Sequence, residues 1–194
     1  MQTTQIMSQA KTLTSTELEQ VLSYIATQSF PQRNRLMLLT GLWSGMRVGE
    51  ISSLTISDVM NPDRSVKAEV RLTAEQTKGR QPRTVFLPQK LRDELTAYLV
   101  LRTDAKPEHP LFVTAGRKRF SANVMAQHFH YLFKKAGIAG ASSHSMRRSF
   151  ITNLANKGIG VRVLASICGH RSIAVTQRYI DVNDEMKRNA VELI

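Results

Sequence analysis

The chain has 194 residues, 42% of them hydrophobic, and carries a formal net charge of +12 with a sequence pI of about 10.3. This length fits one domain with a proper core and at most a small second module. No apolar run approaches membrane-spanning length, the polar N-terminus lacks the core of a signal peptide, and the single cysteine excludes an internal disulfide. The charge implies a polyanionic partner, most economically nucleic acid. The single cysteine fits a reducing compartment, and a cytoplasmic location is expected.

Two rival classes are disfavoured. The positive charge is scattered along the chain and not gathered on one amphipathic helix, which argues against a membrane-surface protein. No Cys/His cluster has zinc spacing and no carboxylate run suggests magnesium or calcium, so neither a metal nor another cofactor is expected.

Hydrophobic periodicity and capping signals predict a mainly helical chain. The expected helices are Thr14–Ile25, Arg35–Trp43, a short helix carrying Glu50 and Leu54, Leu91–Leu101, Asn123–Lys135, Ser143–Lys157 and Ile173–Ile180. The alternating runs Val66–Thr73 and Thr84–Leu87 predict two short strands, and Leu111–Val113 is a candidate third. The fold class is therefore mainly α with a small antiparallel β-sheet. A flexible leader (1–12), one domain (13–182) and a tail helix (183–194) are expected.

The helix expected from Ser143 places one arginine unusually. At 100° per residue its apolar stripe consists of Met146, Phe150, Ile151 and Leu154. Arg147 falls roughly 35° from the centre of that stripe, His144 nearer its edge and Arg148 on the far side. Because an arginine turned toward a core is costly unless an anion meets it, the wheel singles out Arg147.

A glycine interrupts the helical pattern further on. In one uninterrupted helix, His170 and Tyr179 would lie on opposite faces. Gly169 breaks that pattern and Ser172 is a suitable N-cap for the next helix, so a turn here lets the two side chains converge. Taken singly, each of these residues is more simply interpreted as a surface or satisfied core side chain.

In order and spacing, His144-x-x-Arg147, Gly169-His170 and Tyr179 resemble the C-terminal boxes of the tyrosine recombinases, the phage integrase family. Two upstream boxes also match, since Gly45-Met46-Arg47-Val48-Gly49-Glu50 fits the family's Gly-x-Arg-x-x-Glu and Thr77-Lys78-Gly79 lies between the two expected strands. The departures are Met146, where the family prefers Leu, and Arg148-Ser149, where it often has His-Thr. The family uses none of these positions for chemistry.

The resemblance implies the tyrosine recombinase catalytic-domain fold and a catalytic set of Arg47, Lys78, His144, Arg147, His170 and Tyr179. In that chemistry the tyrosine attacks a phosphodiester and becomes joined to the 3′-phosphate, the arginines and histidines meet the anionic charge, and the lysine protonates the departing 5′-oxygen. A phenol has a pKa of about 10, so cationic surroundings must favour the phenolate. No metal ion or ATP is implied.

The expected partners are double-stranded DNA, further copies of the chain in a dimer or tetramer on that DNA, and an accessory DNA-bending protein as a further candidate. The proposed DNA contacts are Arg80, Arg83, Arg117, Lys118, Arg119 and Arg148. The cluster Gly116–Arg119 precedes Ser121, the N-cap of a helix, which suits phosphate binding, although a solvated loop is an equal alternative.

Several alternatives stay open at this point. A type IB topoisomerase would use the same chemistry, and a non-enzymatic DNA-binding helical protein would use the fold alone. The N-terminal helical domain with which these recombinases close around DNA is missing, so the chain is either a minimal recombinase or a piece of a longer one. The target site and the mode, whether integration, excision, inversion or resolution, are not determined.

The residues after Tyr179 predict a short amphipathic helix. Its apolar positions are Met186, Ala190, Leu193 and Ile194, at i, i+4, i+7 and i+8. About three turns are marginally stable alone in water, so this stripe needs a partner. It either folds back on its own domain or, as the resemblance favours, docks on a neighbouring protomer.

Overall fold

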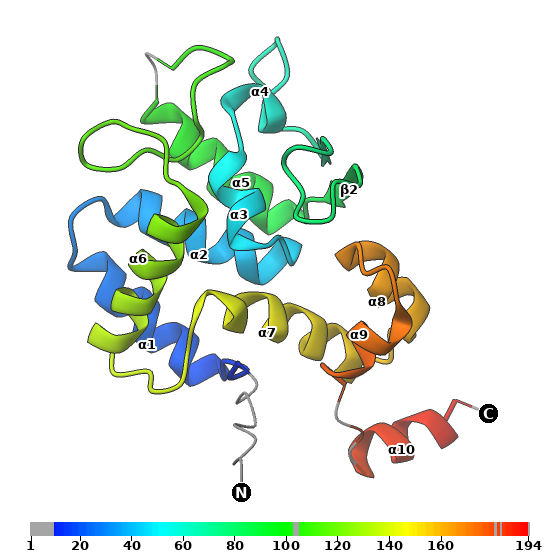
Figure 1. Cartoon of the computed structure of the whole chain (residues 1–194). Coiled ribbons are helices and arrows are strands. Elements are labelled where there is room, and N and C mark those ends of the chain that lie inside the picture. Colours follow the sequence, from blue (N-terminus) through cyan, green and yellow to red (C-terminus); the bar gives the residue numbers. More distant parts are fainter. Residues whose placement is uncertain (1–9, 103–104, 181, 183, 194) are drawn as a thin grey trace, which may run out of the picture.

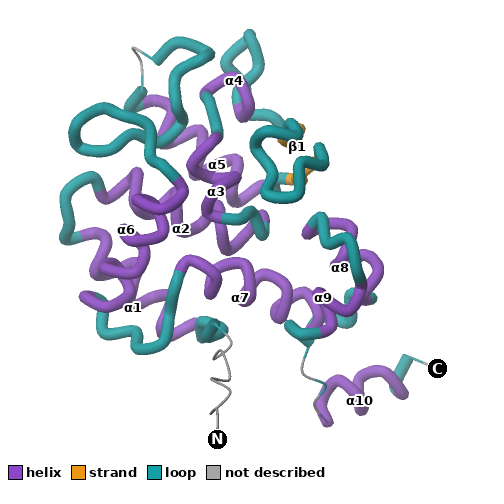
Figure 2. Tube along the Cα trace, in the orientation of Figure 1, coloured by secondary structure: helices purple, strands orange, loops and turns teal. Residues whose placement is uncertain are grey.

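The computed structural model describes residues 10–102, 105–180, 182 and 184–193. Its helices are α1 (Ser15–Ala26), α2 (Pro31–Ser44), α3 (Val48–Ser53), α4 (Ile56–Val59), α5 (Gln89–Val100), α6 (Ala122–Lys135), α7 (Ser143–Asn156), α8 (Val161–Cys168), α9 (Ile173–Gln177) and α10 (Asp184–Val191). Two strands, β1 (Glu69–Leu72) and β2 (Arg83–Phe86), pair antiparallel with Val70 opposite Val85. The predicted class, mainly helical with a small antiparallel sheet, is confirmed (Figure 2).

The start of α1 shows how local sequence and long-range contact cooperate. Thr14 and Glu17 form the predicted capping box, in which the Glu17 N–H donates to Thr14 Oγ1 and the Thr14 N–H to Glu17 Oε2. The preceding residue, Leu13, is buried, and its N–H donates to Ser149 Oγ on α7 at 2.8 Å. Residues 1–9 of the expected leader lie outside the described residues.

Helix α2 runs through the centre of the molecule and is buried along most of its length. Two glycines let it approach α7 closely, because a Cβ at Gly41 would come 2.8 Å from Met146 Sδ and one at Gly45 would come 2.5 Å from Phe150 Cδ1. Gly45 also ends α2 with a φ of 65°, a conformation that favours glycine. The chain leaving this tight contact presents Arg47 at the start of α3.

The prediction of a third strand at Leu111–Val113 is wrong. Leu111 and Phe112 are fully buried, which explains the apolar run, but the only ladder contacts at this segment are single bridges at Pro110 and Val113. Side chains replace a neighbouring strand here. Arg102 donates to the carbonyls of Pro110 and Leu111, and Arg33 donates to that of Val113.

The helices differ from the prediction in three places. Helix α9 ends at Gln177, short of Ile180, and α4 in the N-terminal half and α8 in the C-terminal half form where the periodicity gave no separate helix. Together α7, α8 and the segment after α9 enclose a second small core, formed by Ile151, Ala155, Leu164 and Cys168. This core lies at one end of α7, beside the main body (Figure 1).

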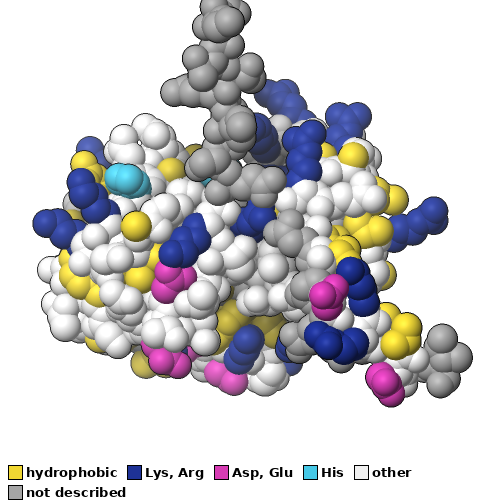
Figure 3. All heavy atoms as spheres, turned by 90° about the horizontal axis from the view of Figure 1, so that it is seen from below, with side chains coloured by type: hydrophobic (Ala, Val, Ile, Leu, Met, Phe, Trp, Pro, Cys, Tyr) yellow, Lys and Arg dark blue, Asp and Glu magenta, His cyan; other side chains and the backbone are white. Residues whose placement is uncertain are grey.

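The predicted tail helix is present as α10, which lies apart from the rest of the described chain (Figures 1 and 2). Seen from below, Lys and Arg side chains predominate over Asp and Glu on the exposed face (Figure 3). Within the described residues, no helix combines the length and the apolar character needed to cross a membrane.

Candidate active site

Arg147 is the buried centre of the site. Its side chain leaves α7 toward the packed side, as the wheel predicted, and the residue is only 4% exposed. Nη1 donates to the carbonyl of Gly45 at 2.5 Å, while Nη2 donates to that of Cys168 at 2.6 Å and lies 2.8 Å from His170 Nε2. Burial lowers the pKa of Arg147 to about 10. One guanidinium therefore joins the end of α2, the end of α8 and the turn that carries His170.

The contacts of His170 fix its tautomer. An arginine can only donate, so His170 Nε2 accepts from Arg147 and the ring proton lies on Nδ1, 2.8 Å from Oγ1 of the buried Thr176. Burial lowers the pKa of His170 to about 4, and the neighbouring Arg147 adds to the effect. The ring is thus neutral near pH 7. In this arrangement Nε2 is an acceptor, whereas the resemblance implied that His170 donates to the phosphate.

Tyr179 lies against His170. The two ring centroids are 5.8 Å apart with planes inclined by 14°, so the turn at Gly169 brings the rings together as predicted. The Tyr179 backbone is held on both sides, since its N–H donates to the carbonyl of Thr176 and its carbonyl accepts from Thr152 Oγ1 at 3.0 Å. The guanidinium carbon of Arg148 lies 5.8 Å from the centroid of the Tyr179 ring.

Glu50 connects the two upstream arginines. Its carboxylate is buried and accepts from the Arg47 N–H at 2.7 Å, from Arg47 Nη1 at 3.2 Å and from Arg83 Nη2 at 2.7 Å. Burial alone would raise the pKa of Glu50, but the hydrogen bond and charge of Arg83 outweigh it and hold the pKa below its usual value. Two arginines on one carboxylate leave a net positive charge, and the Arg47 side chain remains 29% exposed.

Arg83, predicted as a DNA contact, points into the protein. Its side chain is 10% exposed, and Nη1 donates to the carbonyl of Ile167 at 2.8 Å in addition to the bonds with Glu50. Gly169, with a φ of 62°, lies against its aliphatic part. Arg83 therefore links β2 to α3 and to the end of α8.

The predicted catalytic residues line two neighbouring hollows. Lys78, exposed in the β1–β2 connection, shares a hollow of about 610 Å³ with Arg47 and His170. His144, also exposed, shares one of about 480 Å³ with Tyr179. His170 lines the first hollow and Tyr179 the second, so the two stacked rings connect them. The structure thus brings His170 into contact with both Arg147 and Tyr179, and the other three residues line the two hollows.

The remaining DNA-contact candidates differ in their surroundings. Arg80, Arg117 and Lys118 are exposed in loops, the two arginines with positive φ. Arg119 donates to the carbonyl of Ser53 at the end of α3, at 2.6 Å. Arg148 lies beside Tyr179, and its Nε donates to Thr12 Oγ1 at 3.2 Å.

Sequence reasoning did not find the roles of two residues. Thr176 orients His170, and its place three residues before Tyr179 on a short helix was the available signal. Glu50 was interpreted only as the partner of Arg47, whereas it also holds Arg83. Among the described residues, no group of three or more His, Cys, Asp or Glu side chains is arranged to hold a metal ion.

Known proteins resemble this chain in sequence and in fold. The model of the phage integrase family matches residues 11–186. Tyrosine recombinase XerA of Pyrococcus furiosus is 33% identical over 185 residues, which cover 94% of this chain and 61% of the relative. The crystal structure of XerA recombinase matches with a TM-score of 0.77 at 27% identity, over 96% of this chain and 65% of that one. The catalytic domain of bacteriophage HP1 integrase matches with a TM-score of 0.64 at 25% identity, over 88% and 87%.

The helical fold with its small sheet is that of a tyrosine recombinase catalytic domain. The chain belongs to the phage integrase family. It spans about three fifths of the length of the curated XerA relatives.

Proposed function

We propose that this protein is a site-specific DNA recombinase that cleaves and rejoins DNA through a 3′-phosphotyrosine intermediate. The observation that carries the proposal is the Tyr179 ring stacked on His170, which is itself hydrogen-bonded to the buried Arg147. A tyrosine held beside a fixed cation, with further arginine and lysine side chains in the adjoining hollow, suits attack on a phosphodiester.

The proposed cleavage step forms one bond and breaks another. The Tyr179 phenolate oxygen attacks phosphorus, and the P–O bond to the 5′-oxygen breaks. Lys78 gives its proton to that oxygen. Arg47 and Arg147 stabilise the negative charge that gathers on the phosphate oxygens, because a guanidinium keeps its charge and its planar fork fits phosphate.

The proposed joining step reverses this chemistry. The 5′-hydroxyl of a second strand gives its proton to Lys78 and attacks the phosphotyrosine, and the P–O bond to Tyr179 breaks to release the phenolate. Because the protein–DNA bond retains the energy of the broken phosphodiester, the reaction needs no ATP. Fixed arginines meet the charge that a metal ion would otherwise meet, so we propose that it needs no metal either.

The proposed substrate is double-stranded DNA, bound by two or four copies of the protein. The exposed side chains of Arg80, Arg117 and Lys118 are suited to contact its backbone, and Arg148 lies beside the nucleophile. The family match favours a recombinase over a DNA-binding protein without activity and over a type IB topoisomerase. Site-paired products from a plasmid would support recombination, whereas simple relaxation would support the topoisomerase.

A covalent-capture experiment tests the chemistry. Purified protein is incubated with a pool of duplexes taken from the DNA that flanks its gene, and SDS-resistant adducts are sought on a denaturing gel. The wild-type protein and Tyr131→Phe, which alters an exposed tyrosine on α6, are expected to form the adduct. Tyr179→Phe is expected to form none while binding DNA within about twofold of the wild type. An adduct with Tyr179→Phe would show that the nucleophile is another residue.

A further inference from the structure

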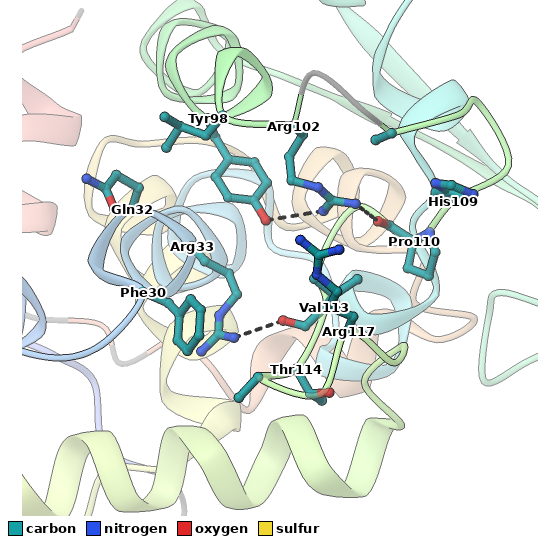
Figure 4. A pocket seen from close by; sticks show the side chains of 13 residues that line it. Phe30, Gln32, Arg33, Tyr98, Arg102, His109, Pro110, Val113, Thr114 and Arg117 are labelled. Atoms are coloured by element: carbon teal, nitrogen blue, oxygen red, sulfur yellow. Dashed lines mark hydrogen bonds between the residues drawn. The ribbon is translucent and has the colours of Figure 1, made fainter.

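Away from the active site, three arginines meet at one pocket, between the start of α2, the end of α5 and the loop before α6 (Figure 4). Arg33 comes from α2, Arg102 follows α5 and Arg117 comes from the loop. The pocket has a volume of about 470 Å³, within the usual range for small-molecule sites. None of the described residues that line it is Asp or Glu.

Arg33 is the buried cation of this group, at 8% exposure. It donates to the carbonyl of Val113 at 2.8 Å and to Asn34 Oδ1 at 2.9 and 3.1 Å, and it lies over the rings of Phe30 and Phe120. All of these partners are neutral. A buried cation without a counter-charge is costly, and burial lowers the pKa of Arg33. An anion in the pocket would relieve that cost.

Arg102 and Arg117 extend the positive charge across the pocket. Arg102 donates to the carbonyls of Leu111 and Pro110 at 2.6 and 3.2 Å and contacts the Tyr98 hydroxyl, again only neutral groups. The Arg117 side chain points toward Arg102, and both residues line the pocket with Arg33 (Figure 4). A guanidinium has five N–H donors, so the bonds of Arg33 and Arg102 leave donors for a ligand.

We propose that this pocket binds the phosphate group of a nucleotide. Guanidinium forks fit phosphate oxygens bidentately, and three of them around one space suit a diphosphate better than a carboxylate. Phe30, 49% exposed at the rim, offers a ring face to a base. The same phosphate chemistry has two sources, a free nucleotide or the backbone of bound DNA, because Arg117 also belongs to the cluster Gly116–Arg119.

Calorimetric titration with inorganic pyrophosphate and with ADP tests the site, with adenosine as the uncharged comparison. Both phosphates are expected to bind and adenosine is not. Arg117→Gln and Arg102→Gln are each expected to weaken binding at least about tenfold, the loss of one charged bidentate contact. Arg64→Gln is the matched control, because it removes the same charge from an exposed side chain that does not line the pocket. The affinity of this variant should stay within about twofold of the wild type.

Two results would overturn the proposal: absence of binding by both phosphates, or equal affinity in the wild type and Arg117→Gln. The second would show that the phosphates bind without Arg117 and therefore outside the proposed group of three arginines. Arg102→Gln also removes the hydrogen bonds to the carbonyls of Pro110 and Leu111, so the melting temperature of this variant is measured as well. The affinity of Arg117→Gln is therefore the deciding measurement.

A short DNA duplex distinguishes the two sources of phosphate. If the duplex displaces ADP and itself binds less well to Arg117→Gln, the phosphate in the pocket is that of DNA. If ADP binds equally to free and DNA-loaded protein, the ligand is a free nucleotide. Tyr179→Phe should bind ADP like the wild type, because Tyr179 does not line this pocket. The two proposals are therefore tested separately, and failure of phosphate binding here would not contradict the proposed recombinase activity.

Discussion

Gly169 lies directly against Arg83. A Cβ at Gly169 would come 2.6 Å from Arg83 Cδ, so no other residue fits without moving that side chain. The same arginine donates to Glu50, which in turn holds the Arg47 backbone at the start of α3. The turn that presents His170 and the helix start that presents Arg47 therefore share one support on β2.

This arrangement predicts that Arg83 acts through Glu50. Arg83→Gln breaks a buried ion pair, which typically costs about 3–5 kcal/mol, so a clear loss of thermal stability is expected. Below the new melting temperature, single-turnover adduct formation should fall at least about tenfold while the Kd for DNA changes less than about threefold. Arg83→Lys, which keeps the charge, should recover part of the rate.

Arg80→Gln is the control for this experiment, because Arg80 is exposed in the same β1–β2 connection. It should weaken DNA binding and reduce its salt dependence with little change in the rate on bound DNA. If Arg83→Gln shows that pattern instead, Arg83 is the DNA contact that the sequence suggested.

Lys78→Ala is expected to slow cleavage strongly by removing the group that protonates the 5′-oxygen. A substrate whose 5′-leaving oxygen is replaced by sulfur should be cleaved by the variant almost as fast as by the wild type, since a thiolate leaves without a proton. Adduct yields on the two substrates provide the measurement. Equal impairment on both would remove Lys78 from this role.

Acid is expected to destabilise the fold through two histidines. Burial lowers the pKa values of His128 and His170 to about 4 from an ordinary value of 6.5, and the charges of Arg33 and Arg147, respectively, add to it. As the pH falls, these histidines are protonated in the unfolded chain before they are protonated in the folded protein. The stability that they contribute is therefore fully present above about pH 6.5 and is lost as the pH drops toward 4. Each histidine contributes at most about 3 kcal/mol to this loss.

Urea unfolding at about pH 4.5 and about pH 7.5 provides the measurement. His128→Asn should reduce the difference in unfolding free energy between the two conditions. The stability that Glu50 contributes is lost at lower pH, since its pKa lies below the ordinary 4.5 and the contribution disappears only as the pH falls through that lower value. An unchanged difference in the variant would assign the loss to groups other than His128.

Deletion of Asp184–Ile194 tests the tail. Because α10 lies apart from the rest of the described chain, the truncated protein should remain a folded monomer with nearly normal melting. If the helix docks on a neighbouring protomer, the truncated protein should bind one DNA site and fail to pair two, as seen by native gel shift and light scattering. A large drop in melting temperature would show instead that the tail packs on its own domain.

Local sequence was sufficient for features that depend on neighbouring residues. Two such features were predicted correctly: the capping box at Thr14 and the packed side of α7, toward which Arg147 points. Both are set by residues within a few positions of one another. The turn at Gly169, with its positive φ, likewise follows from the residue itself, and it brings His170 onto Tyr179. The boxes from Gly45 to Tyr179 indicated the family because each is a short motif and their order along the chain can be read directly.

Only the tertiary structure decided which distant groups each side chain meets. From the sequence, Arg83 was a basic loop residue. In the structure it points inward because it donates hydrogen bonds to Glu50 and to the carbonyl of Ile167, which lie 33 and 84 positions away along the chain. Residues 111–113 looked like a strand, but the guanidiniums of Arg33 and Arg102 satisfy their carbonyls in place of a neighbouring strand. Burial requires every backbone polar group and every charge to find a partner, and the sequence does not show which distant segment supplies it.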